Sequence, residues 1–133
     1  MDRALHRHKQ GLNMYLSIGG WTLSDPFPVI AANPIYRENF IDSVVNYLSV
    51  NEHITGIDLE WEFIGVDGPK KGAMSDADTD NYTKLIYELR QRLDLIKPGY
   101  HLTAAVGTAP KHLNKINWTA KVIDGKLYPG VSD

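Results

Sequence analysis

The sequence predicts an α/β fold in which parallel strands alternate with helices. Segments of alternating apolar and polar residues, the pattern of strands, are separated by longer segments with apolar residues at helical spacing. Each predicted strand has one strongly apolar face, suited to lie under helices, and a second face of small and polar residues. Strands that alternate with helices of a dozen or more residues imply βαβ units with right-handed crossovers, so the strands are expected to form a parallel sheet.

The predicted elements follow in the order helix, strand, helix, strand, helix, strand. Their expected positions are residues 2–10, 13–20, 34–50, 54–62, 78–96 and 100–107. The second helix begins with Asn33 as its N-cap and Pro34 at its first position. The third helix ends at Lys97-Pro98-Gly99.

Helical spacing also identifies the side chains that we expect in the core. The helix at 34–50 is expected to bury Tyr36, Phe40, Val44, Tyr47 and Leu48. The helix at 78–96 is expected to bury Tyr82, Leu85, Ile86, Leu89 and Leu93. Residues 21–28 and 63–77 are expected to be loops, and residues 108–133 form a weakly patterned tail.

The composition is that of an ordinary globular domain, with 133 residues, of which 43% are hydrophobic and 23% charged. A net charge of −2 gives no electrostatic basis for binding nucleic acid or an anionic membrane. The lack of cysteine excludes disulfides and thiol catalysis. No apolar run approaches the ~20 residues of a membrane span, and residues 1–11 lack the apolar region of a signal peptide.

One predicted strand carries a row of acidic side chains on alternate positions. The carboxylate row consists of Asp58, Glu60 and Glu62. The apolar residues that face the other way are Ile57, Leu59 and Trp61. Because alternate residues lie ~6.6 Å apart along a strand, the carboxylates repel one another and favour the retention of a proton. A carboxyl group that stays protonated near neutral pH can act as a general acid; a solvated acidic face is the alternative interpretation.

The neighbouring strands leave room beside the carboxylate row. The small and polar residues on their corresponding faces are Ser17, Gly19, Thr103, Ala105 and Gly107. The first strand ends in Gly19-Gly20-Trp21, where glycine lets a ligand or another backbone segment approach closely. Small residues beside a carboxylate row favour the mouth of a (β/α)₈ barrel, whose active site lies at the carboxyl ends of the strands. Glu62 lies at such an end.

Two of these segments resemble glycoside hydrolase family 18, the chitinases. Leu-Ser-Ile-Gly-Gly-Trp at residues 16–21 resembles the S-x-G-G segment on the third barrel strand of that family. Thr-Gly-Ile-Asp-Leu-Glu-Trp-Glu at residues 55–62 resembles its D-G-x-D-x-D-x-E segment on the fourth strand. Residues 102–105 are similar to the fifth strand. The Gly-Gly-Trp run and Trp61-Glu62-Phe63 look most like the bacterial exochitinase-type branch.

The resemblance implies that residues 1–133 form part of a family 18 catalytic domain. The implied fold is α/β, a partial (β/α)₈ TIM barrel with about three parallel strands, barrel strands 3–5, and flanking helices. A complete barrel needs ~250 residues, so we expect the central portion here. An incomplete barrel has open sheet edges, which predict that the isolated chain self-associates.

The resemblance also implies a reaction, the hydrolysis of β-1,4 bonds between N-acetylglucosamine units with retention and with help from the substrate's own acetamido group. In that mechanism Glu62 is the general acid and base, Glu60 orients the acetamido group, and Asp58 holds Glu60 and shares its proton. The candidate substrate-binding residues are Ser17, Gly19, Gly20, Trp21, Trp61, Phe63 and Ala105. The implied partner is chitin or an N-acetylglucosamine oligosaccharide, without cofactor, metal, nucleic acid or membrane, and the implied location is outside the cell.

Two positions depart from the family's pattern. Thr55 stands in place of the motif's first Asp, but alternation turns it away from the carboxylate row. Glu60 stands in place of the third Asp and is one methylene longer, and a misplacement of ~1 Å can cost ~100-fold in rate. Two alternatives therefore stay open. One is a lectin-like family member that binds chitin oligomers without cleaving them, and the other is an α/β fragment with a solvated acidic strand.

Overall fold

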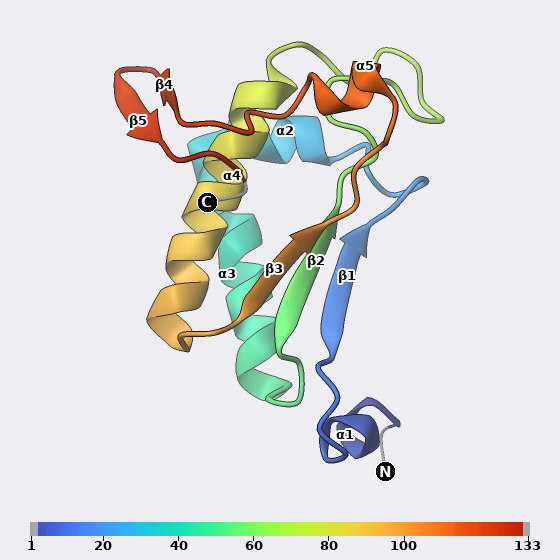
Figure 1. The fold of residues 1–133 in the computed structure, drawn as a ribbon, viewed down its shortest axis with the longest axis vertical. Coiled ribbons are helices and arrows are strands. Elements are labelled where there is room, and N and C mark those ends of the chain that lie inside the picture. The colour runs from blue at the N-terminus through green and yellow to red at the C-terminus, as the bar shows by residue number, and fades with distance from the viewer. Residues whose placement is uncertain (1–2, 132–133) are drawn as a thin grey trace.

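A three-stranded parallel sheet forms the centre of the structure, a computed structural model that describes residues 3–131 (Figure 1). Its strands, in spatial order, are β1 (Tyr15–Gly19), β2 (Gly56–Glu60) and β3 (His101–Ala104). The register places Asp58 between Ser17 and Thr103. The predicted parallel arrangement is confirmed, with β2 in the middle and the other strands at the edges.

Each strand is shorter than the sequence predicts. β1 is shortened at both ends, β2 ends at Glu60 rather than Glu62, and β3 ends at Ala104 rather than Gly107. Regular backbone pairing stops at these points, and Gly19 opposite Glu60 is the last pair between β1 and β2. Glu62 therefore belongs to the connection that follows β2.

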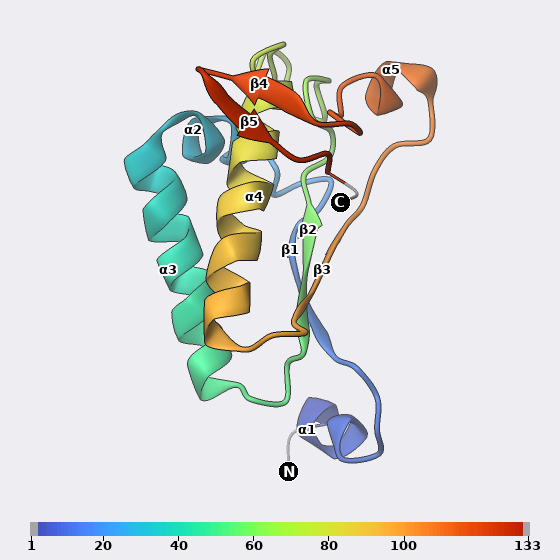
Figure 2. The same ribbon diagram turned by 60° about the vertical axis from the view of Figure 1, so that its left-hand side comes forward.

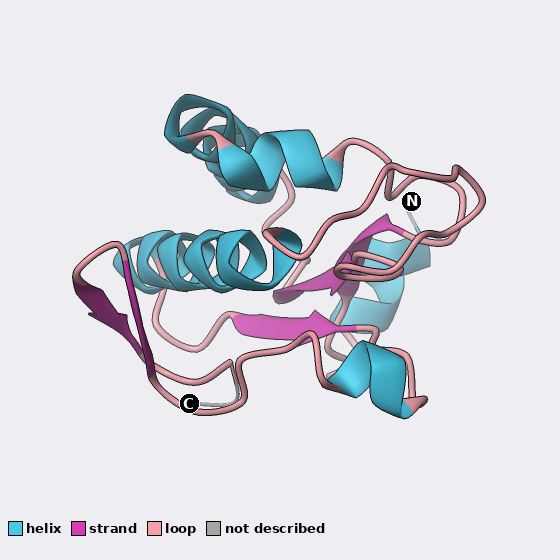
Figure 3. Ribbon diagram, turned by 90° about the horizontal axis from the view of Figure 1, so that it is seen from above, coloured by secondary structure: helices cyan, strands magenta, loops and turns pink. Residues whose placement is uncertain are grey.

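Helices α3 (Pro34–Val50) and α4 (Asp78–Ile96) have the predicted bounds and lie on one side of the sheet (Figure 2, Figure 3). The side-chain oxygen of Asn33 accepts hydrogen bonds from the amides of Ile35 and Tyr36, at 2.9 and 3.4 Å, which confirms its role as N-cap. At the start of the chain, α1 (Arg3–His8) covers part of the helix expected at residues 2–10, and residue 2 lies outside the described part of the chain.

The sequence analysis does not predict the short helix α2 (Phe27–Ala32), which overlaps the loop expected at residues 21–28. Its buried side chains, Phe27 and Ala31, lie four residues apart on one face. Phe27 stacks on Trp61 with ring centroids 5.5 Å apart. Six residues hold too few turns for a periodic pattern to be recognised, so this helix is identified by its packing rather than by its local sequence.

The tail also contains regular structure that the sequence analysis does not predict. Helix α5 (Pro110–Leu113) is followed by an antiparallel hairpin of β4 (Lys121–Ile123) and β5 (Lys126–Tyr128). The turn residues Asp124 and Gly125 both have positive φ, 51° and 78°, as two-residue hairpin turns require. The Asp-Gly pair is the sequence signal that could have identified the hairpin.

The apolar faces of the sheet and helices meet in one core. The apolar side chains of β2, Ile57 and Leu59, are fully buried. The buried apolar side chains of α4 are those predicted, Tyr82, Leu85, Leu89 and Leu93, and Ile86 packs against them while partly exposed. Leu16 and Ile18 of β1 and Leu102 of β3 are partly buried and pack against the same core, so the prediction that each strand turns its apolar face toward the helices is confirmed.

Helix α3 turns a different set of side chains inward than the sequence predicts. Tyr36 and Tyr47 are 49% and 41% exposed, which corrects their assignment to the core. Arg37 and Ile41 are buried instead, together with the predicted Val44. Helical spacing marks aromatic residues as core candidates, but it does not anticipate an arginine that is buried because an acidic partner faces it.

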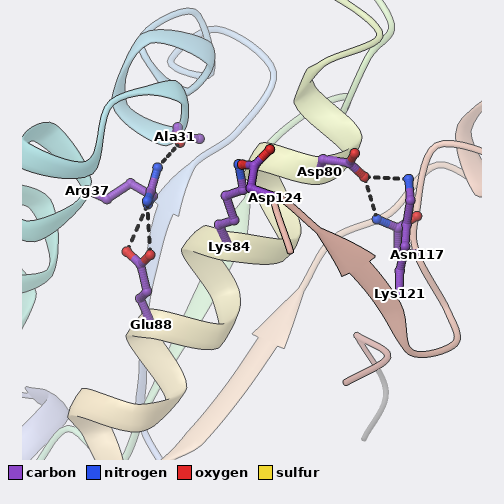
Figure 4. A network of polar contacts seen from close by, with 8 residues as sticks. All are labelled: Ala31, Arg37, Asp80, Lys84, Glu88, Asn117, Lys121 and Asp124. Carbon is purple, nitrogen blue, oxygen red and sulfur yellow. Dashed lines mark hydrogen bonds and ion pairs between the residues drawn. The ribbon is translucent and has the colours of Figure 1, made fainter. Parts of the chain in front are cut away.

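The buried arginine joins three helices (Figure 4). The guanidinium group of Arg37, on α3, donates to both carboxylate oxygens of Glu88 on α4, at 2.8 and 3.0 Å. It also donates to the carbonyl of Ala31 on α2 at 2.7 Å. A bidentate pair of this kind fixes orientation as well as distance, so Arg37 sets how α2 and α3 lie against α4.

Helix α4 also holds the tail in place (Figure 4). Lys84 forms an ion pair with Asp124 in the hairpin turn, with 2.6 Å between Nζ and Oδ2. Asp80 accepts hydrogen bonds from Lys121 at 2.7 Å and from Asn117 at 2.9 Å. These contacts attach the hairpin to the amino-terminal half of α4.

Replacing Arg37 with Ala is expected to lower the free energy of unfolding by about 2 kcal/mol, because it leaves Glu88 without its partner. Losing one member of a fully buried pair costs ~3–5 kcal/mol, and the 31% exposure of Glu88 reduces the loss. The matched control, Arg92→Ala, breaks a more exposed pair with Asp42 and should cost less than about 1 kcal/mol. Urea denaturation measures both, and equal losses would contradict the role assigned to Arg37.

Candidate active site

The carboxylate row begins with Asp58 in the middle of β2. The hydroxyl of Ser17 on β1 donates to its Oδ2 at 2.6 Å, and the hydroxyl of Thr103 on β3 donates to its Oδ1 at 2.8 Å. The parallel register places these side chains in line across the sheet. Asp58 therefore receives one hydrogen bond from each neighbouring strand.

These hydrogen bonds decide the protonation state of Asp58. Burial of the carboxyl group raises its pKa, but hydrogen bonds from Ser17, Thr103 and Glu60 together outweigh burial and hold the pKa of Asp58 below its ordinary value. Asp58 is thus held in its charged form by the groups that surround it.

Gly19 and Gly20 let Glu60 lie against the end of β1. The amide of Gly20 donates to the Glu60 carbonyl at 2.7 Å. A Cβ on Gly19 would lie 2.4 Å from that carbonyl oxygen, and one on Gly20 would lie 3.2 Å from Oε2 of the Glu60 carboxyl group. Both glycines also have positive φ, 108° and 90°, which residues with a side chain rarely adopt. The predicted close approach is confirmed, and the group that approaches is Glu60.

Glu62 lies just beyond β2, in the turn that follows it, and the peptide bond from Glu62 to Phe63 is cis. The residue is partly buried. Its amide donates to the hydroxyl of Ser24 at 2.9 Å. Sequence reasoning missed Ser24, because nothing in its residue type distinguishes it from a solvated serine in a loop.

Aromatic rings adjoin the carboxylates in sequence and contact one another in space. Trp21, which is 52% exposed, directly follows Gly20, and Phe63 directly follows Glu62. Their ring centroids are 6.2 Å apart. Phe63 in turn stacks on His112 of α5, with centroids 4.5 Å apart and planes at 23°. Sequence reasoning missed His112 as well, because the tail carries no pattern that places it beside Phe63.

Trp61, predicted to bind substrate, lies in the core and is 1% exposed. It stacks on Phe27 and meets Tyr82 edge to face, with ring centroids 5.5 and 5.9 Å away. Its indole N–H donates to the sulfur of Met74 at 3.1 Å. Alternation turns Trp61 away from the carboxylate row, so its assignment to substrate binding is wrong and its role is packing.

Two hollows are lined in part by β3 or by the segment that follows it. Ala105, which follows β3, lines a small cavity together with Phe63 and His112. A larger cavity of about 400 Å³ lies between α4, β3 and residues 129–131, and Thr103 is part of its lining. Asp58, Glu60 and Glu62 are each partly exposed.

Among residues 3–131, no group of three or more His, Asp and Glu side chains is arranged to hold a metal ion. Within the same residues, no helix is both long and apolar enough to cross a membrane.

The family model for glycosyl hydrolases family 18 matches residues 1–125. The chain is 35% identical over 123 residues to chitinase A of Pseudoalteromonas piscicida. It is 36% identical over 125 residues to the chitinase of Autographa californica nuclear polyhedrosis virus. Both alignments cover 88% of this chain, but they cover only 15% and 22% of the two relatives. The chain therefore spans less than a quarter of the length of either relative.

Solved chitinase structures resemble the fold. Chitinase ChiA74 from Bacillus thuringiensis matches with a TM-score of 0.77 and 30% identity, over 84% of this chain and 18% of that structure. Chitinase RmChi1 from Rhizomucor miehei matches with a TM-score of 0.72 and 31% identity, over 80% and 33%. The Ostrinia furnacalis Group IV chitinase in complex with allosamidin matches with a TM-score of 0.68 and 26% identity, over 82% and 28%. The predicted partial TIM barrel is confirmed.

Removing either hydroxyl beside Asp58 is expected to raise the pKa of that carboxyl group. Ser17→Ala and Thr103→Val each delete one hydrogen bond to the charged form while leaving the burial that raises the pKa. The carboxyl carbon of Asp58, followed by ¹³C NMR during a pH titration, measures the shift. Ser43→Ala, at an exposed position on α3, should leave the pKa unchanged. An Asp58 pKa that stays at the wild-type value in both variants would contradict this account.

Proposed function

This chain belongs to glycosyl hydrolase family 18, and we propose on that basis that it supplies the catalytic carboxylates of a chitinase. The proposed reaction is the hydrolysis of β-1,4 bonds in polymers of N-acetylglucosamine. The observation that carries the proposal is the carboxylate row, in which Asp58 is held from both neighbouring strands and bonded to Glu60. The chain spans only 15% and 22% of two relatives. We therefore propose that it acts as part of a complete barrel and not as an isolated chain.

In the proposed reaction Glu62 first acts as the general acid. It gives its proton to the glycosidic oxygen as the bond from that oxygen to C1 breaks. The acetamido oxygen of the substrate attacks C1 and forms an oxazolinium ion, so the sugar itself supplies the nucleophile. Glu62, now ionised, takes a proton from the water that attacks C1 as the bond between C1 and the acetamido oxygen breaks, so the acetamido group is regenerated and the product keeps its original configuration. The position of Glu62 beyond the end of β2 suits this role.

Glu60 and Asp58 act together on the acetamido group in this proposal. Asp58, whose pKa is held below its ordinary value, supplies negative charge beside Glu60, and that charge stabilises the positive charge that develops on the oxazolinium ion. Gly20 places no side chain between the end of β1 and the Glu60 carboxyl group. Thr55, which replaces the motif's first Asp, accepts a hydrogen bond from the amide of Met14 at 3.1 Å, so it is engaged in joining the strand ends.

The proposed sugar-binding surface consists of the rings of Trp21 and Phe63, which offer flat apolar area beside the carboxylates. Ser17, the two glycines and Ala105 border it. We also propose that the protein is secreted, as the family resemblance implies. It also includes self-association of the isolated chain through β1 and β3, since both strands lie at sheet edges.

A family member that binds chitin oligomers without cleaving them is the second candidate. Glu60 is the observation in its favour, because the extra methylene changes where the carboxyl group can lie relative to the family's Asp. Glu62 favours hydrolysis, because it retains the acid on which cleavage depends. The two candidates differ in one result: the first expects shortened products from an N-acetylglucosamine oligomer, whereas the second expects the oligomer to be bound and recovered intact.

In a complete barrel that carries this segment, Glu62→Gln is expected to abolish cleavage of N-acetylglucosamine oligomers while leaving binding largely intact. The amide keeps the shape of the side chain but cannot donate a proton as an acid does, and such groups contribute roughly 10²–10⁴-fold to rate. The rate is measured by product chromatography and binding by calorimetry. Glu38→Gln makes the same chemical change on the exposed surface of α3 and should be neutral. If Glu62→Gln kept more than about a tenth of the activity, the acid would have been assigned wrongly.

A further inference from the structure

The hydroxyl of Ser24 joins three backbone groups where β1 and β2 part. It donates to the carbonyls of Gly20, at 2.8 Å, and Glu60, at 2.9 Å, and it accepts from the amide of Glu62 at 2.9 Å. One hydroxyl proton is shared between the two carbonyls, and a lone pair of the same oxygen serves the amide. Because the Ser24 side chain is 1% exposed, water does not compete for these contacts.

The position of Ser24 matters because the strand ladder ends before Glu62. Gly19 opposite Glu60 is the last pair between β1 and β2, and the amide of Gly20 makes one further bond to the Glu60 carbonyl. The amide of Glu62 lies beyond this ladder, where Ser24 supplies the acceptor that a strand would otherwise provide. Ser24 therefore extends the connection between the two strand ends by two residues, from Glu60 to Glu62.

Ser24 is itself held from the opposite side. Its carbonyl accepts a hydrogen bond from the amide of Phe27 at 3.0 Å. The Phe27 ring, 3% exposed, stacks on Trp61, the residue between Glu60 and Glu62. The segment after β1 thus contacts the segment after β2 in two ways, through the hydroxyl group of Ser24 and through the stacking of Phe27 on Trp61.

We infer that Ser24 is a positioning residue, whose hydroxyl fixes the backbone of Glu62 relative to Glu60 and so sets the place of the general acid. This inference rests on the proposed function of Glu62. Ser24 acts through the backbone and not on the sugar, so its loss should slow the chemical step more than it weakens binding. A misplacement of ~1 Å at a catalytic group can cost ~100-fold in rate.

The test compares variants of the complete barrel that carries this segment. Ser24→Ala is expected to lower kcat about 10–100-fold with KM within about threefold of wild type. Ser24→Cys keeps nearly the same side-chain size but hydrogen-bonds weakly, so its kcat should lie between those of Ser24→Ala and wild type. If Ser24→Ala does not fold, the kcat of Ser24→Cys tests the inference in its place. Thr83→Val removes another buried hydroxyl, 3% exposed on α4, and should leave kcat within about twofold.

Glu62→Gln separates this inference from the proposed function. If Glu62→Gln is inactive while Ser24→Ala and Ser24→Cys keep wild-type kcat, Ser24 does not position the acid and the proposed function stands. If Thr83→Val loses as much kcat as Ser24→Ala, the effect is a general loss of packing and the inference fails. If Ser24→Ala raises KM at constant kcat, Ser24 contributes to substrate binding and does not position the acid, so the inference fails. If Glu62→Gln stays active, both claims fail together.

Discussion

The structure depends on holding several carboxylates on one face of one strand. The charge of Asp58 is stabilised locally, because this side chain takes a hydrogen bond from each neighbouring strand. The register that aligns Ser17 and Thr103 with Asp58 therefore stabilises the charge and joins the strands at the same time. A shift by one residue would turn these hydroxyl groups to the opposite face, so sheet register and protonation state are coupled.

One face of β2 and of the segment after it packs in the core, and the other face carries the carboxylate row. Trp61 lies on the core face, between two residues of the carboxylate row. Its ring packs in the core between Phe27 and Tyr82, while the residues before and after it carry the carboxyl groups proposed to act on substrate. Core packing thus determines where the backbone leaves the sheet, and Ser24 determines how it continues. The site is consequently supported by buried groups in the connection after β1, although its proposed chemistry lies on the other strand.

The sequence was most informative where a pattern repeats. Alternation and helical spacing identified the parallel strands and the bounds of α3 and α4, because those segments are long enough to show their period. Short elements such as α2 have too few residues to show a period. The hairpin could have been predicted from the Asp124-Gly125 pair, since both residues adopt positive φ in the turn. The exposure of Tyr36 followed from tertiary packing, since α3 buries Arg37 against an acidic partner. No local pattern could place His112 or the Ser24 hydroxyl beside the site.

Glu60 is proposed to fill the place of the motif's third Asp, with Asp58 as its partner. The most direct measurement is kcat/KM on an N-acetylglucosamine oligomer for a complete barrel carrying Glu60, Glu60→Asp or Glu60→Ala. We expect Glu60→Asp to maintain or raise kcat/KM, and Glu60→Ala to lower it severely by removing an electrostatic contribution of ~3–4 kcal/mol. If Glu60→Asp were as damaging as Glu60→Ala, or if neither change mattered, Glu60 would not fill the place of the motif's third Asp.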